Sequence, residues 1–135
     1  MAAESVRPDQ LWYQYRPLGD RSIRLLELLP GSAQDGMRCR LRSAGLDDMR
    51  VDHPYEALSY VWGDTGDQVT IACDDACVVS ISRSLLEALH ALRDPISPRI
   101  IWADAICINQ RDDAERSRQV RLIDAIYRNA RRVVV

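Results

Sequence analysis

The chain has 135 residues and a mass of 15.4 kDa, a length that fits one domain and leaves little room for a second. Apolar residues make up 47% and charged residues 28%, a globular composition that excludes general disorder. Arg supplies the positive charge, because Lys is absent, and the net charge is −2. This balance gives no reason to expect nucleic acid or an anionic membrane as a partner.

The first residues are not typical of a secretion signal, and no apolar run approaches the ~18 residues that span a bilayer. We therefore expect a cytoplasmic protein with reduced thiols. Two of the four cysteines, Cys73 and Cys77, are spaced C-x3-C, but His53 and His90 form no matching second pair. Because zinc sites combine two close ligand pairs, we expect no metal site.

The N-terminal part is predicted to be β-rich. Residues 1–22 carry three aromatic residues that we expect to dock on the domain: Trp12, Tyr13 and Tyr15. The apolar stretch 23–29 and the alternating stretch 37–41 predict a β-hairpin with its loop around Gly31–Gly36. We assign residues 1–50 to an N-terminal extension that contains this hairpin.

The middle of the chain predicts three strands and a helix. A strand over 55–62 is followed by a turn, and residues 68–73 and 77–81 predict a second hairpin. Ser84, followed three residues later by Glu87, predicts a capped helix that ends before Asp94-Pro95.

The last third predicts a βαβ unit. The apolar run 99–103 ends at Asp104, and a helix over about 112–130 follows, with Asp112 or Asp113 as N-cap. We expect its apolar face to carry Val120, Ile123 and Tyr127. The strands at 99–103 and 133–135 should then be parallel and covered on both faces. The fold class is α/β: a mixed or parallel sheet with flanking helices, of TIR-like or flavodoxin-like kind.

Two strings are more specific than any periodicity. The first is Tyr-Glu-Ala-Leu-Ser-Tyr-Val-Trp-Gly-Asp over 55–64, and the second is Trp-Ala-Asp-Ala-Ile-Cys-Ile-Asn-Gln over 102–110. In order and spacing they resemble the heterokaryon incompatibility (HET) domain of fungal proteins. We assign residues 51–135 to this HET-like domain, and we expect it to be incomplete at its C-terminus because the chain stops within an apolar strand.

The resemblance implies a cell-death effector in fungal non-self recognition, with protein partners or self-association and a sensor region in a longer chain. The domain is also distantly similar to Toll/interleukin-1 receptor (TIR) domains, some of which hydrolyse NAD. In those, a Ser-Tyr pair ends the first strand and a Glu at a helix start is catalytic. By this analogy, Ser59-Tyr60 and Glu115 are the candidates here, NAD is the candidate substrate, and no cofactor is required.

The candidate catalytic residues are Glu115, Asp104 and Ser59, which we expect around one crevice at the carboxyl ends of the strands. Each also has a structural interpretation. Glu115 fits the N3 position of a capping box with Asp112, in which case Glu115→Gln should cost about 1 kcal/mol or less. Asp104 could instead pair with Arg116 or Arg121, and the Ser59 hydroxyl could bond to backbone.

The candidate cofactor-binding residues are Asn109, Gln110 and Tyr60. Asn109 and Gln110 precede the last helix, whose N-terminus could receive a pyrophosphate, although holding their own loop is the simpler role. Two function classes therefore stay open: an effector that hydrolyses NAD, and a TIR-like interaction module without catalysis.

Overall fold

The computed structural model describes residues 11–32, 34–48, 54–59 and 67–134. The chain divides into two compact units. The first contains the described parts of 1–14, 27–40 and 61–99, and the second those of 15–26, 41–60 and 100–135. The division at residue 50 into an extension and a HET-like domain stays a prediction.

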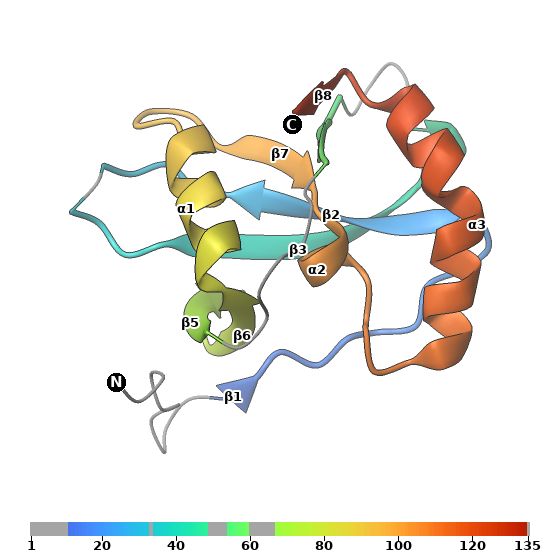
Figure 1. The fold of residues 1–135 in the computed structure, drawn as a ribbon, viewed down its shortest axis with the longest axis horizontal. Helices are drawn as coiled ribbons and strands as arrows, with labels where there is room; N and C mark the ends of the chain where they lie inside the picture. Colours follow the sequence, from blue (N-terminus) through green and yellow to red (C-terminus); the bar gives the residue numbers. More distant parts are fainter. Residues whose placement is uncertain (1–10, 33, 49–53, 60–66, 135) are drawn as a thin grey trace. The chain divides into compact units, whose positions relative to one another are not determined.

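In the first unit the strands follow the hydrogen-bonded order β1-β6-β5-β3, and in the second unit they follow the order β2-β7-β4-β8 (Figure 1). Pairs β1–β6, β3–β5, β4–β7 and β4–β8 are parallel, whereas β5–β6 is antiparallel. The predicted α/β class with a mixed sheet is therefore confirmed. The strands are β1 (Leu11–Trp12), β2 (Ser22–Leu28), β3 (Arg38–Gly45), β4 (Glu56–Leu58), β5 (Gln68–Cys73), β6 (Cys77–Ser82), β7 (Arg99–Trp102) and β8 (Arg132–Val134).

Both predicted hairpins are present. In the first, β2 ends just before Leu29 and β3 begins at Arg38, and the N–H of Leu29 donates to the carbonyl of Arg38. In the second, β5 and β6 pair from Gln68↔Ser82 to Cys73↔Cys77. The turn between them places Asp74 and Asp75 at φ 54° and 63°, a left-handed conformation that Asp tolerates better than most residues.

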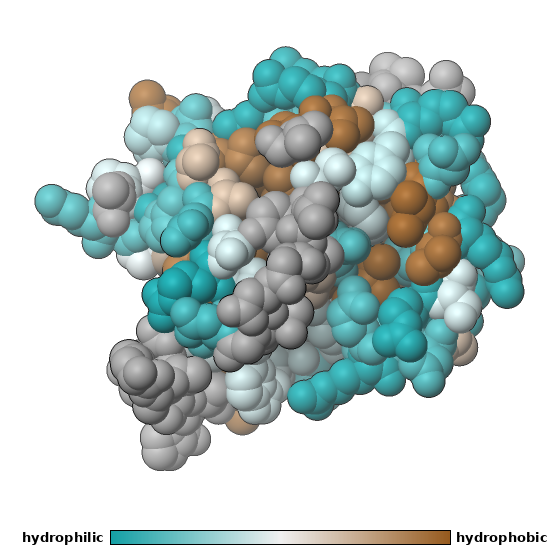
Figure 2. All heavy atoms as spheres, viewed as in Figure 1, coloured by the Kyte–Doolittle hydropathy of each residue, from teal (hydrophilic) through white to brown (hydrophobic). Residues whose placement is uncertain are grey.

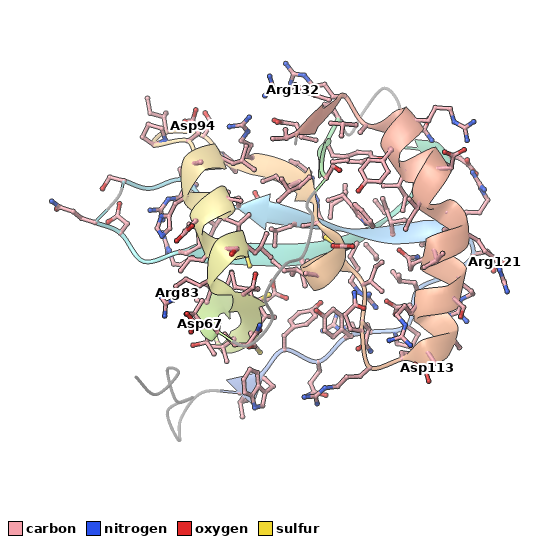
Figure 3. All side chains as sticks on the ribbon, in the orientation of Figure 1. Asp67, Arg83, Asp94, Asp113, Arg121 and Arg132 are labelled. Carbon is pink, nitrogen blue, oxygen red and sulfur yellow. The ribbon has the colours of Figure 1, made fainter. Side chains whose placement is uncertain are left out.

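The helix of the first unit, α1 (Arg83–Leu92), ends before Asp94-Pro95 as predicted, but its N-cap is Ser82 and not Ser84. The Ser82 hydroxyl accepts the N–H of Leu85 at 3.0 Å. Ser82 can do so because it ends β6 in an extended conformation, whereas Ser84 already lies inside the helix. Arg83 bonds to Asp67 beside this helix start (Figure 3).

The cap gives a direct comparison between two serines. Ser82→Ala should lower the free energy of unfolding by about 1 kcal/mol, because the buried N–H of Leu85 loses its acceptor. Ser84→Ala is the matched control and should change stability by less than about 0.5 kcal/mol. Urea unfolding of both variants measures the difference, and equal effects would contradict the assignment.

In the second unit, β7 leads through two helices, α2 (Asp104–Cys107) and α3 (Asp113–Asn129), into β8. Both strands are parallel to β4, which lies between them, so the predicted βαβ crossover is confirmed (Figure 1). The expected cover on both faces is wrong for β8. Arg132 and Val133 are exposed because, among the described strands, β8 is the outermost of its unit and has β4 as its one neighbour.

Helix α3 begins where predicted, with Asp112 as its N-cap, but its buried face differs from the prediction. Val120 is 57% exposed, and the buried residues are Glu115, Gln119 and Ile126. The prediction followed apolar residues, whereas this face is polar near the helix start. Hydrophilic atoms lie along the outer edge of α3 in Figure 2, and Arg121 lies on its outer side in Figure 3.

No helix among the described residues is long and apolar enough to cross a membrane.

Candidate functional site

Polar side chains gather where β4 and β7 end. The parallel register pairs Ala57 with Trp102, so Ser59 just after β4 and Asp104 just after β7 follow strand ends at the same edge. Tyr127 of α3 is hydrogen-bonded to Ser59 and interacts electrostatically with Asp104. Ser59, Asp104 and Tyr127 therefore form one cluster, which we call the strand-end cluster. It lies at the carboxyl ends of parallel strands, where open α/β sheets bind ligands.

The electrostatics of the cluster act on its phenol. Burial raises the pKa of Tyr127, the carboxylate of Asp104 raises it further, and the hydrogen bond with Ser59 opposes both. Trp102 packs edge-on against Tyr127, with ring centroids 5.8 Å apart. The phenol thus stays protonated at neutral pH beside a carboxylate, an arrangement in which one group can donate and the other accept a hydrogen bond.

Glu115 does not lie open to solvent. Its carboxylate forms a bidentate ion pair with Arg24 of β2, with Oε2 at 2.6 Å from Nη1 and Oε1 at 2.8 Å from Nη2. Both side chains are 3% exposed. Oε2 also accepts the N–H of Asn109 at 2.7 Å. Both carboxylate oxygens are therefore occupied by groups of the protein itself.

The predicted capping box is half right. Asp112 accepts the N–H of Glu115 at 3.0 Å, as an N-cap should. The Glu115 carboxylate does not return the bond to Asp112, because it turns inward to Arg24 and Asn109. We therefore expect Glu115→Gln to cost more than the 1 kcal/mol or less of the cap interpretation, since it would leave Arg24 buried without a charged partner.

Arg24 makes further contacts. Nη1 donates to the carbonyl of Cys107 at 3.1 Å and Nη2 to the carbonyl of Arg16 at 2.6 Å. The ring of Tyr15 lies 4.7 Å from the guanidinium carbon, and its hydroxyl donates to the carbonyl of Ile106 at 2.7 Å. For Tyr15, the expected docking of the aromatic segment is confirmed.

The balance of forces on Glu115 gives a pH dependence. Burial by itself would raise the pKa of Glu115, but the hydrogen bonds from Arg24 and from the N–H of Asn109, with the charge of Arg24, outweigh it and hold the pKa below its usual 4.5. Because the pKa is lower in the folded chain, this carboxylate stabilises the fold above pH 4.5 and loses that contribution as pH falls through its folded value.

We therefore expect the free energy of unfolding to fall as the pH drops below 4.5, the usual pKa of this carboxyl. Glu115→Gln should be less stable than the original chain at pH 7, and this difference should narrow in acid because the original carboxylate is then protonated. Urea unfolding at several pH values measures it. Asp124→Asn, an exposed change on the same helix, is the control; a gap for Glu115→Gln that stays constant with pH would contradict the prediction.

The other predicted residues hold the loop before α3. The side chain of Asn109 accepts the N–H of Arg111 at 3.2 Å, and Nε2 of Gln110 donates to the carbonyl of Asp104 at 2.9 Å. Tyr60 lies outside the described residues. Asp112 is the N-cap of α3 and the first turn carries Asp113 and Glu115, and these carboxylates disfavour an anion there. Arg116 bonds to Asp113 and to the carbonyl of Gln110.

Two buried polar atoms have no hydrogen-bond partner among the described residues: Nε1 of Trp102 and Oε1 of Gln119. The described residues also include no group of three or more His, Cys, Asp or Glu side chains that could hold a metal ion.

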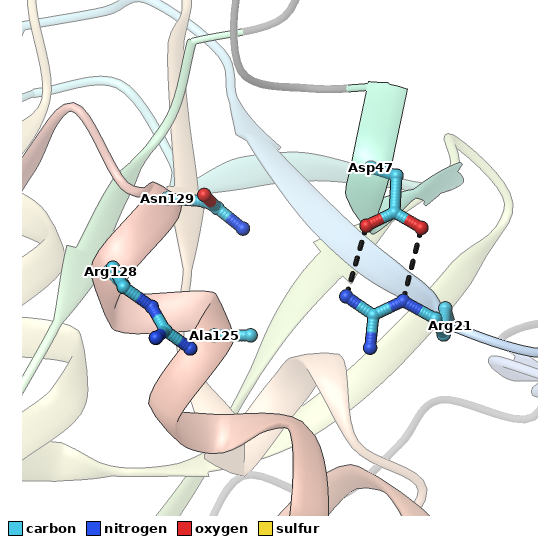
Figure 4. A pocket seen from close by; sticks show the side chains of 5 residues that line it. All are labelled: Arg21, Asp47, Ala125, Arg128 and Asn129. Atoms are coloured by element: carbon cyan, nitrogen blue, oxygen red, sulfur yellow. Dashed lines mark hydrogen bonds and ion pairs between the residues drawn. The ribbon is translucent and has the colours of Figure 1, made fainter.

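A separate hollow of about 470 Å³ is lined by Arg21, Asp47, Ala125, Arg128 and Asn129 (Figure 4). Arg21 donates to both oxygens of Asp47, at 3.0 and 2.9 Å, so an ion pair forms part of the wall. None of the predicted site residues lines the hollow.

The structure thus brings Ser59 and Asp104 together and places Glu115 in a buried ion pair. Sequence reasoning missed Arg24 and the role of Tyr127. A signal for Arg24 was present, because it stands between the apolar residues Ile23 and Leu25 in a predicted buried strand. A charge inside such a strand requires a partner.

These features define the chain as an α/β protein with a parallel β7–β4–β8 layer and a polar cluster at its carboxyl edge. The model of the heterokaryon incompatibility protein (HET) family matches residues 55–135, and the chain belongs to this family. The match includes all three residues of the strand-end cluster, whereas Tyr15 and Arg24 lie upstream of it.

A relative supports the assignment. The chain is 37% identical over 126 residues to "Heterokaryon incompatibility protein 6, OR allele" of Neurospora crassa. The match covers 84% of this chain but 18% of the relative, so the chain spans under a fifth of that protein's length. No solved structure matches the chain significantly, and the TIR-like or flavodoxin-like assignment stays a prediction.

Proposed function

We propose that the chain is the HET domain of an effector that triggers cell death in fungal non-self recognition. Membership of the HET family, together with the similarity to a heterokaryon incompatibility protein, carries this proposal. The effector acts in the cytoplasm, with a sensor region elsewhere in a longer chain and protein partners or self-association as its trigger.

For the chemistry of killing, we propose hydrolysis of NAD at the strand-end cluster. The bond between nicotinamide and C1′ of the ribose breaks, and nicotinamide leaves with the bonding electrons. Water adds to the resulting ribosyl cation and releases a proton. Asp104 supplies the negative charge that stabilises the cation, and Ser59 and Tyr127 hold the ribose hydroxyls.

The supporting observation is the meeting of Ser59, Asp104 and Tyr127 at one strand edge. We assign Asp104 rather than Glu115 to the cation, because Glu115 is 2% exposed and its oxygens are bonded to Arg24 and Asn109. A carboxylate in that position has no free face for a substrate. Asn109 and Gln110 then hold the loop beside the substrate.

The second candidate function is an interaction module without catalysis. Its supporting observation is the exposed apolar surface of the second unit, where Val120 on α3 is 57% exposed and Val133 on the outer strand β8 is 42% exposed. Apolar side chains at a strand edge favour pairing with another chain.

Inducible expression of the full-length gene product in a fungal host, with viability and NAD followed together, separates the candidates. NAD hydrolysis predicts death with falling NAD, and Asp104→Asn should slow NAD loss by about 100-fold or more. Asp113→Asn, an exposed carboxylate at the start of α3, is the matched control and should kill normally. Death with unchanged NAD would support the interaction module, and survival with folded protein would contradict the effector.

A further inference from the structure

We propose that Arg24 is a positioning residue: from β2, it holds the one-turn helix α2 and the loop that follows, and thereby the place of Asp104 at the strand edge. The contacts that carry this inference belong to the second unit alone. Only the importance of Asp104 for killing rests on the proposed function.

Helix α2 is too short to be stable by itself. It has four residues, and a single turn in water is unstable because few hydrogen bonds offset the ordering of its backbone. Its last carbonyls have no partners within the helix. The hydroxyl of Tyr15 supplies a donor to Ile106, and Nη1 of Arg24 supplies one to Cys107. Both donors come from residues more than 80 positions earlier in the chain.

Arg24 also holds the loop that follows α2. Arg24 orients the carboxylate of Glu115 through two bonds, and that carboxylate accepts the N–H of Asn109. Arg24 therefore acts on the carbonyl of Cys107 directly and on Asn109 through Glu115. Asp104 begins this held segment, and its carbonyl accepts the N–H of Ile108 at 3.2 Å.

The choice of Arg is informative because a buried ion pair is not in itself an efficient way to stabilise a fold. Apolar residues of similar size often do as well. A guanidinium adds what they lack, namely several donors in a rigid plane. Here that plane reaches Glu115, Cys107 and Arg16 simultaneously.

Arg24→Lys tests the inference, because Lys keeps the charge opposite Glu115 but loses the planar fork. We expect the rate of amide hydrogen exchange at Ile108 and Asn109 to rise about 10-fold or more, which corresponds to the loss of one hydrogen bond. The exchange rates in the strands of the second unit should stay unchanged. Arg21→Lys is the matched control, since Arg21 also forms a bidentate ion pair, and its partner Asp47 lies outside α2. Its exchange at Ile108 and Asn109 should stay normal.

A second measurement, the pKa of Tyr127, reports whether Asp104 stays close to the phenol. In the original chain, Asp104→Asn should lower the pKa of Tyr127, because it removes the carboxylate that raises it. In the Arg24→Lys chain the same change should have a smaller effect, since Asp104 is no longer held beside the phenol. Titration of Tyr127 by NMR in the four chains measures this, and an equal effect in both backgrounds would overturn the inference.

Uniformly faster exchange across the unit would also overturn it, because that result indicates general destabilisation. If Arg24→Lys does not fold, Tyr15→Phe replaces it: this variant keeps the ring over Arg24 and removes the hydroxyl that donates to the carbonyl of Ile106. It should raise exchange at Ile108 and Asn109 more than elsewhere, and normal exchange there would count against the proposal. These measurements require no catalysis, so a failure of NAD hydrolysis would not be confused with a failure of this inference.

Discussion

Replacing Arg24 with Met should lower the free energy of unfolding by about 3–5 kcal/mol, because it leaves the carboxylate of Glu115 buried without its counter-ion. Met fills much of the same volume, so the loss reports the charge and its hydrogen bonds more than packing. Urea unfolding at pH 7 measures it. Because this loss of stability comes from the unpaired carboxylate of Glu115, it should be smaller in a variant that also removes that carboxylate.

Two comparisons test this explanation. The double variant Arg24→Met, Glu115→Leu should recover a substantial part of the stability, since apolar pairs can replace buried ion pairs. Arg21→Met removes a similar bidentate pair with Asp47 at the surface, where the side chains are 50% and 69% exposed, and should cost about 0–1 kcal/mol. A double variant as unstable as Arg24→Met would contradict the assignment of the loss to an unpaired carboxylate.

Trp102→Ala should cost about 3–5 kcal/mol, because this side chain is the largest fully buried one among the described residues and its loss leaves a cavity beside Tyr127. Trp102→Phe should cost much less. Phe keeps an aromatic ring for the edge-on contact and removes the indole N–H, which has no hydrogen-bond partner among the described residues.

The same unfolding measurement applies, with Trp12→Ala as control, since Trp12 is 50% exposed and its removal should change stability little. Similar losses for Phe and Ala at position 102 would show that the indole N–H has a partner that stabilises the fold.

The elements that sequence reasoning predicted well are those defined by local chemistry. The strand alternation of residues 68–73, the helix stop at Asp94-Pro95 and the cap at Asp112 each depend on neighbours within a few positions. The cap of α1 was misplaced by two residues because Ser82 and Ser84 are chemically identical, and only the end of β6 makes Ser82 extended.

For the candidate site, the sequence by itself determined the HET resemblance and the place of Asp104 at the end of an apolar run, because such a run is a local pattern. The local pattern predicted a strand over 55–62, and only the TIR analogy put Ser59 at a strand end, whereas β4 ends at Leu58. Only the tertiary structure decided that Glu115 faces Arg24 and that Tyr127 joins Ser59. Glu115 and Arg24 are 91 positions apart, and either could have faced solvent. Burial selects between these outcomes, since an enclosed carboxylate must find a cation, and which cation it finds depends on how β2 and α3 pack.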